Sequence, residues 1–203
     1  MSKERSGSCT MLMSVLMSSP GPIVVGLGLM AGRSATQLAD FVRRSAELLA
    51  IIVAFVVYRI TNRPEKAAEK ARLERMSNLF VGAVMCVSGG AMLLITLLSD
   101  GGEKGNVIPG LTIAVLGVIA NGLFWRKYTR LSCQTGSSIL AVQSRLYRAK
   151  TLVDGCVTTA LTAVALFPQS AAAGWLDLIG SIIVSVYLIY CGGKTIREHR
   201  KPV

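Results

Sequence analysis

Long apolar runs separated by short polar segments dominate the pattern of this chain. A helix needs roughly 20 apolar residues to cross the hydrocarbon core of a membrane. Six stretches come near that length, and we therefore predict an all-α polytopic membrane protein. The predicted transmembrane domain covers residues 1–203, with spans at about 9–32, 34–60, 76–98, 107–126, 137–167 and 173–193. We expect no cytoplasmic C-terminal domain, because about ten residues follow the last predicted span.

Two of the predicted spans are irregular. Pro20-Gly21-Pro22 lies inside the first, where proline removes a backbone donor and must break or kink the helix. In the fifth, the apolar run before Pro168 is too short to cross a bilayer, so the helix must begin near Ser137. That extension carries four charged residues into the membrane, namely Arg145, Arg148, Lys150 and Asp154.

Composition agrees with a membrane protein and argues against other classes. The chain is 52% hydrophobic and 16% charged, which excludes intrinsic disorder. Its five cysteines are odd in number and widely spaced, which argues against a disulfide scaffold. The net charge of +11 is typical of nucleic-acid binding only when it covers one solvated face. Here the basic residues lie between apolar runs, so we expect a lipid bilayer as partner and no nucleic acid.

The distribution of lysine and arginine predicts the orientation. Fifteen basic residues lie before the first span, between spans two and three, between spans four and five, and after span six. Only Arg33 and Lys104 lie on the other side. Because cytoplasmic loops carry an excess of basic residues, we predict a multi-pass protein with both termini in the cytoplasm. The polar connector Asn62–Arg75 is expected to be a solvated, helix-forming lead into span three, with lipid-headgroup binding as an alternative.

Charged residues inside the second predicted helix are the most informative feature. Asp40, Arg43, Arg44 and Glu47 fall on a stripe roughly 100° wide, and they form two (i, i+4) pairs of opposite sign. Ionisable groups within a span are costly and usually face the bundle interior. We therefore expect this stripe to face other helices.

The fifth predicted helix carries a second polar stripe, formed by Gln143, Tyr147, Thr151 and Asp154, with Lys150 beside it. Antiparallel helices bring the two stripes to one level near the midplane, where secondary carriers place their substrate sites. The predicted substrate pathway comprises Asp40, Arg43, Arg44, Glu47, Asn121, Tyr147, Thr151 and Asp154. The alternative is an ion-pair network that only holds the helices in register.

Other chemistry finds little support in the sequence. The single histidine, His199, falls in a segment expected to be an exposed tail, and the cysteines lack CxxC spacing, so no His- or Cys-based metal cage is expected. No nucleotide-binding loop, catalytic triad or carboxylate dyad is present, so we expect neither an enzyme nor a cofactor. Gly89-Gly90, Gly117 and Gly122 are expected to let helices pack closely.

Three blocks of sequence occur in an informative order: LADFVRRSAE at 38–47, ARLERMSNLFVGAVMCVSGG at 71–90 and WLDLIGSIIVSVYLIYCGGKTI at 175–196. Together with six spans and both termini inside, they resemble the cation diffusion facilitator family. The resemblance implies a six-helix bundle, usually homodimeric, that exports a divalent metal in exchange for protons. It also implies a metal site between helices two and five.

The residues at the family's metal positions depart from its pattern. The helix-two step falls on Arg43 and Glu47, and the helix-five step falls on Tyr147 and Thr151. Only the carboxylates Asp40 and Glu47 remain as weak metal candidates. We therefore predict a cation transporter of this type, with protons as a possible counter-ion. Two alternatives stay open: a non-transporting scaffold or partner subunit, and a carrier for an anionic or zwitterionic solute suggested by the formal +2 charge of the two helices.

Overall fold

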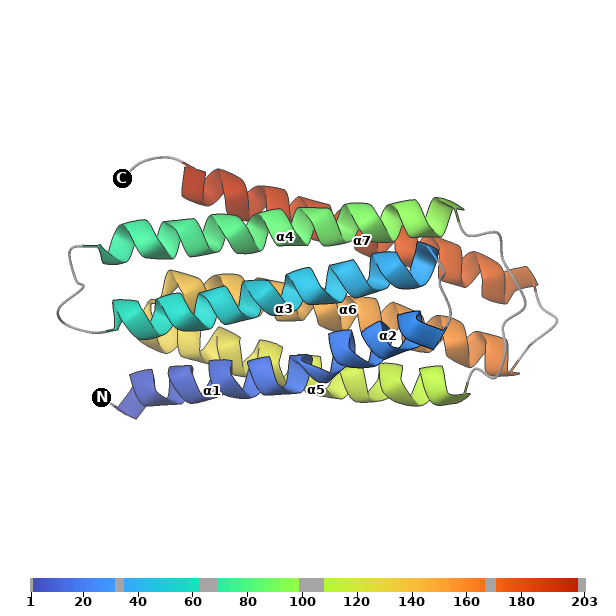
Figure 1. Ribbon diagram of the computed structural model, residues 1–203, viewed down its shortest axis with the longest axis horizontal. Helices are drawn as coiled ribbons and strands as arrows, with labels where there is room; N and C mark the ends of the chain where they lie inside the picture. The colour runs from blue at the N-terminus through green and yellow to red at the C-terminus, as the bar shows by residue number, and fades with distance from the viewer. Residues whose placement is uncertain (1, 32–34, 63–68, 99–107, 167–170, 201–203) are drawn as a thin grey trace.

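The structure, a computed structural model, describes residues 2–31, 35–62, 69–98, 108–166 and 171–200. Some side chains within these ranges are not described, among them those of 28–31 and 35–40. The described residues form seven helices, which confirms the predicted all-α bundle (Figure 1). They are α1 (Ser2–Ser18), α2 (Pro20–Ala31), α3 (Ala35–Thr61), α4 (Lys70–Leu98), α5 (Ile108–Thr135), α6 (Ser138–Leu166) and α7 (Ala171–Arg200).

The first predicted span is divided into α1 and α2 at the predicted break. The last backbone hydrogen bond of α1 runs from Ser19 N to Val15 O at 3.0 Å. Pro20 has no N–H to continue the series, and it occupies the first position of α2, where its fixed φ suits a helix start. The Ser19 hydroxyl donates to Leu16 O at 2.9 Å, so it satisfies the carbonyl that proline leaves without a partner.

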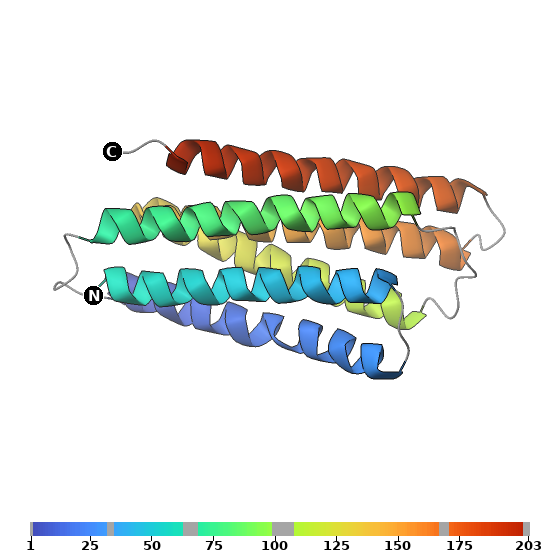
Figure 2. The same cartoon turned by 45° about the horizontal axis from the view of Figure 1, so that its top comes forward.

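All seven helices run along the long axis of the bundle, and the two chain termini lie at the same end (Figures 1 and 2). We call this the terminal end. α4 packs antiparallel on α7, α5 packs on α6, and α3 lies against α4 and the first two helices. Gly136 closes the connection from α5 to α6 with a φ of +66°, a left-handed conformation that favours glycine. This topology agrees with the predicted placement of both termini on one side of a membrane.

Several helices extend past their predicted spans. α4 begins at Lys70 instead of 76, and α7 continues to Arg200 instead of 193. The last part of the predicted connector is therefore the first part of α4, while residues 63–68 lie outside the described residues. Among the described residues, α4 and the Leu178–Arg200 part of α7 have the length and apolar content needed to cross a membrane. The apolar sequences of α3 and α6 are interrupted by the buried charges of Glu47 and Lys150, and the first span is divided at Ser19.

Large apolar side chains cover much of the outer surface of the bundle. Leu94 of α4, Leu116 of α5 and Ile183 of α7 are each about 60% exposed. A soluble monomer rarely exposes so many large apolar residues, whereas lipid contact stabilises them. The buried core comprises apolar side chains from α1 and α3 to α7, and includes Ile51, Met85, Leu140 and Leu188.

Small residues bring α4 and α7 into backbone contact. A Cβ atom on Gly89 would lie 2.8 Å from Ser185 O, and one on Gly192 would lie 2.6 Å from Gly82 O. Gly82 and Gly89 are seven residues apart on α4, as are Ser185 and Gly192 on α7, so the two rows meet in antiparallel register. Of the glycines highlighted by the sequence, Gly89 has the predicted packing role, whereas a Cβ on its neighbour Gly90 would meet nothing within 4 Å.

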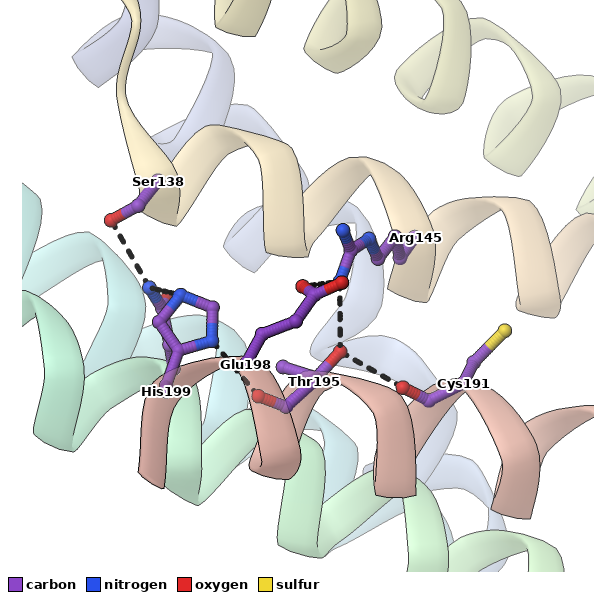
Figure 3. Close-up of polar contacts among 7 residues, drawn as sticks. Ser138, Arg145, Cys191, Thr195, Glu198 and His199 are labelled. Carbon is purple, nitrogen blue, oxygen red and sulfur yellow. Dashed lines mark hydrogen bonds and ion pairs between the residues drawn. The ribbon is translucent and has the colours of Figure 1, made fainter. Parts of the chain in front are cut away.

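A polar network joins α4, α6 and α7 at the terminal end (Figure 3). Asn78 Nδ2 lies 3.0 Å from His199 Nε2 and donates to Ser138 Oγ at 3.1 Å. His199 Nδ1 lies 2.9 Å from Thr195 O. The prediction that His199 belongs to an exposed tail is therefore wrong: α7 continues through it, and its half-buried ring is bonded to the neighbouring helix.

Candidate substrate site between α3 and α6

Glu47 is the centre of the polar contact between α3 and α6. Its side chain is only 7% exposed, and its carboxylate has cations on both sides. Lys150 Nζ of α6 lies 3.4 Å from Glu47 Oε2. Arg43, which is on α3 like Glu47 itself, lies 3.7 Å from Glu47 Oε1. A buried carboxylate needs such compensation, because moving an unpaired charge from water into the protein interior costs roughly several kcal/mol.

The sequence positions Glu47 through the amphipathic character of α3. The apolar positions Ala50, Ile51 and Ala54 are fully buried and hold α3 against its neighbours. Glu47 lies one turn before Ile51, so it enters the bundle on the buried face. The predicted (i, i+4) pair between Arg43 and Glu47 is present.

Lys150 lies beside the α6 stripe and is not part of the predicted pathway, yet its ammonium reaches Glu47 of α3. Its ammonium lies 3.4 Å from Glu47 and 5.3 Å from the centre of the Tyr147 ring. The side chain is 18% exposed. A four-carbon stem lets a residue at the margin of a stripe place its charge against a neighbouring helix. The length of the lysine side chain is therefore the feature of the sequence that indicates this contact.

Tyr147 is fully buried and its hydroxyl is directed towards α1. The hydroxyl lies 3.3 Å from Ser18 Oγ and donates to Ser14 O at 3.5 Å. Its ring packs on Tyr128 and Phe124 of α5, with centroids 5.3 Å and 5.2 Å away. Tyr147 therefore forms the aromatic wall beside Lys150, and its oxygen is held by α1.

The two other uncharged members of the α6 stripe differ in how they are satisfied. Thr151 Oγ1 donates to Tyr147 O at 2.8 Å, so its hydroxyl is bonded within its own helix. Gln143 is fully buried, and among the described residues neither of its amide atoms has a hydrogen-bond partner. Buried amides without partners are rare and usually bind water or a ligand. Gln143 therefore extends the polar column from Tyr147 towards the terminal end.

Asp154 forms a second polar contact, one turn beyond Lys150 on α6. Asn121 of α5 donates to Asp154 Oδ2 at 2.6 Å, and Gly117 provides the space for the carboxylate. A Cβ on Gly117 would lie 2.5 Å from the same oxygen. Two residues of the predicted pathway thus pair with each other, on α5 and α6.

The remaining charges of α6 lie away from Glu47. Arg145 binds Glu198 of α7 at 2.5 Å, at the terminal end (Figure 3). Arg148 stacks over Trp125 and Tyr187, with its guanidinium 5.7 Å and 5.9 Å from the ring centres. The formal +2 that suggested an anionic solute included these two arginines, and their interactions are with α5 and α7.

The first turn of the α3 stripe is only partly described. The side chain of Asp40 lies outside the described residues, so its predicted pairing with Arg44 stays a prediction. Arg44 lies against Gly21 of α2. Across the described residues, no three His, Cys, Asp or Glu side chains come together in a way that would hold a metal ion.

Comparison with known proteins identifies the family. Individually curated proteins gave no match to the chain. The family model of the cation efflux transmembrane domain matches residues 11–201, which is nearly the whole chain and includes every residue of the α3–α6 contact. Members of this family are integral membrane cation transporters. The chain therefore belongs to the cation efflux, or cation diffusion facilitator, family.

Proposed function

We propose that this protein carries a cation through the contact between α3 and α6, near the middle of the membrane, with Glu47 as the exchangeable carboxylate. The observation that supports this is the buried ion pair between Glu47 and Lys150. A carboxylate in the interior of a membrane bundle usually marks an ion pathway. Glu47 is also one of the few positions where the chain keeps a ligand type found in the family's metal site.

In this proposal, the described conformation is the unloaded state. Lys150 and Arg43 occupy the space beside Glu47 and neutralise it, as a cargo cation would. Cargo binding then requires both cations to move away from the carboxylate. A proton on Glu47 would weaken both ion pairs, which gives a simple route to exchange of a cation for protons.

The cargo expected here is a weakly held cation. A tight divalent site needs several carboxylates or imidazoles at once, and within the described residues Glu47 has arginine and lysine as its ionic neighbours. The rest of the predicted pathway, formed by Asp40, Arg43, Arg44, Asn121, Tyr147, Thr151 and Asp154, remains part of the proposal. We add Lys150 as the internal counter-cation and Gln143 as a polar group towards the terminal end.

A second candidate is a non-transporting member of the family that acts as a membrane scaffold or partner subunit. The observation in its favour is the complete compensation of Glu47, which two cations neutralise in the described conformation. In that case the ion pairs would only fix helix register. The two candidates differ in whether Glu47 controls flux or stability alone.

The deciding experiment is flux in proteoliposomes under a pH gradient, across a panel of monovalent, divalent and organic cations and one of organic acids. We expect cation flux in the wild type and its loss in Glu47→Gln. Glu198→Gln is the matched control, because it makes the same chemical change in an exposed ion pair at the terminal end. No flux of any cation in the wild type, or equal flux in Glu47→Gln, would favour the scaffold. Flux confined to organic acids would reverse the expected charge of the cargo.

We also propose that both termini face the cytoplasm and that the protein forms homodimers. The common end of the two termini and the excess of basic residues there support the orientation. Homodimers are typical of the family. Labelling of cysteines added at the termini of vesicle-embedded protein tests the first, and the mass of the purified particle tests the second.

A further inference from the structure

A pocket at the terminal end, between α1 and α3, carries chemistry that cation transport does not use. Its volume is about 450 Å³. Its lining comprises Arg5, Ser8, Cys9, Leu12, Phe55, Arg59 and Asn62. Arg5 lies near the start of α1, Arg59 lies in the last turn of α3, and Asn62 directly follows that helix. Glu47 lies about three turns earlier on α3, so the pocket is separated from the α3–α6 contact along the bundle.

The polar side chains of the pocket can donate hydrogen bonds, and each is either positively charged or neutral. Its described lining contains two arginines and no carboxylate, and among the described residues neither arginine forms an ion pair. Arg59 has a cation–π contact with Phe55, at 6.0 Å from the ring centre, which orients its guanidinium. Asn62 Nδ2 is buried and has no hydrogen-bond partner among the described residues. Two guanidiniums and an unpartnered amide are suited to an acceptor with several negative oxygens.

The apolar part of the pocket indicates where that acceptor comes from. Leu12 is 45% exposed on the side of α1 that continues with Leu16, which is 56% exposed. A ligand whose charge lies at Arg5 and Arg59 would thus continue along an apolar surface towards the middle of the bundle. A free phosphate ion would leave that surface uncovered, whereas a phospholipid has an anionic headgroup and acyl chains in this order.

We propose that this pocket binds the headgroup of an anionic phospholipid in the leaflet at the terminal end. Arg5 and Arg59 bind the phosphate oxygens, Asn62 donates its amide hydrogen, and an acyl chain lies along Leu12. Arginine is suited to this role because its planar fork binds two phosphate oxygens at once. The inference depends on the membrane placement of the bundle but not on the cargo or on Glu47.

The test uses the full chain, purified in a neutral detergent, and thermal unfolding as the readout. Phosphatidylglycerol is titrated in one arm, phosphatidylcholine in a second and inorganic phosphate in a third. We expect phosphatidylglycerol to raise the unfolding midpoint in a saturable way, with little effect of the other two. Arg5→Gln with Arg59→Gln should raise the half-saturating concentration at least about tenfold, since each removes a charge-assisted hydrogen bond.

Two further variants make the result specific. Lys127→Gln with Arg130→Gln removes the same charge from exposed positions of α5 outside the pocket, and we expect it to keep the wild-type response. Asn62→Asp keeps the shape of the side chain but adds a negative charge, so it should also raise the half-saturating concentration of phosphatidylglycerol. The proposal is overturned if the pocket variant (Arg5→Gln with Arg59→Gln) and the α5 variant lose the response equally. It is also overturned if phosphatidylcholine acts like phosphatidylglycerol, or if inorganic phosphate alone gives the full shift.

Discussion

Lys150 of α6 lies 3.4 Å from Glu47 of α3, and this ion pair joins two helices that pack mainly on other neighbours. α3 packs most extensively on α4, and α6 on α5. An ion pair at a sparse contact between helices is well suited to open and close, because few other contacts must break with it.

The Glu47–Lys150 pair should be energetically coupled. We expect the effects of Glu47→Gln and Lys150→Met on the free energy of unfolding to be non-additive by about 0.5–3 kcal/mol, as is usual for residues in direct contact. Denaturant titration in detergent of the two single variants and the double variant measures this coupling. Arg148→Met is the control, because Arg148 contacts Trp125 and Tyr187. If the effects of Glu47→Gln and Lys150→Met on the free energy of unfolding were additive, the ion pair would contribute nothing to stability.

Close packing of α4 on α7 should not tolerate a methyl group at Gly192. A Cβ there would lie 2.6 Å from Gly82 O, and the backbone of α4 cannot move without disturbing the whole interface. We expect Gly192→Ala to destabilise the protein by about 1–3 kcal/mol, as overpacking does elsewhere. At the adjacent Gly193 an added Cβ meets nothing within 4 Å. Gly193→Ala should therefore be neutral or stabilising by up to about 1 kcal/mol, and equal losses in both variants would contradict the packing explanation.

Asn121 should be required as the partner of Asp154. Asn121→Leu removes the donor that lies 2.6 Å from the carboxylate, and we expect a loss of about 1–3 kcal/mol in unfolding free energy. Replacing both residues by leucine removes the buried polar group altogether, so the double variant should recover much of that loss. Unfolding in detergent compares the three proteins. A double variant less stable than Asn121→Leu would show that Asp154 has another essential partner.

The terminal-end ion pair should give a pH-dependent contribution to stability. The hydrogen bond from Arg145 holds the pKa of the Glu198 carboxyl below its ordinary value. Since that pKa is lowered by folding, the contribution is present above the ordinary pKa of a glutamate and is lost as pH falls through the lowered value. The unfolding midpoints of wild type and Glu198→Gln should therefore differ near neutral pH and converge as the pH falls through the lowered pKa of Glu198.

The expected size of this pH effect is small. Both side chains are more than a third exposed, at 34% and 38%, so solvent screens the pair and its contribution should stay below about 1 kcal/mol. Arg145→Gln should remove the same pH-dependent contribution to stability that Glu198→Gln removes. A midpoint difference that grows as pH falls would contradict the assigned direction.

Helical character, the break near Pro20 and the inward stripe of α3 follow from the sequence alone. Hydrophobic periodicity, proline chemistry and the cost of charge in lipid are local properties, and each depends on residues within one helix. The Arg43–Glu47 pair could be predicted for the same reason, because four residues make one helical turn. Family resemblance also lies in the order of such local blocks, and the match over residues 11–201 confirms it.

Tertiary structure decided which partners those residues meet. Lys150 reaches Glu47, Asn121 reaches Asp154, and His199 lies within hydrogen-bond distance of Asn78, and each of these contacts joins two different helices. A helical pattern gives the direction of a side chain around its own axis, but not the rotation or height of the helix opposite. Those are set by packing, here in part by the approach of Gly82 to Gly192. For this reason the sequence indicates where charge is buried, and the fold determines what neutralises it.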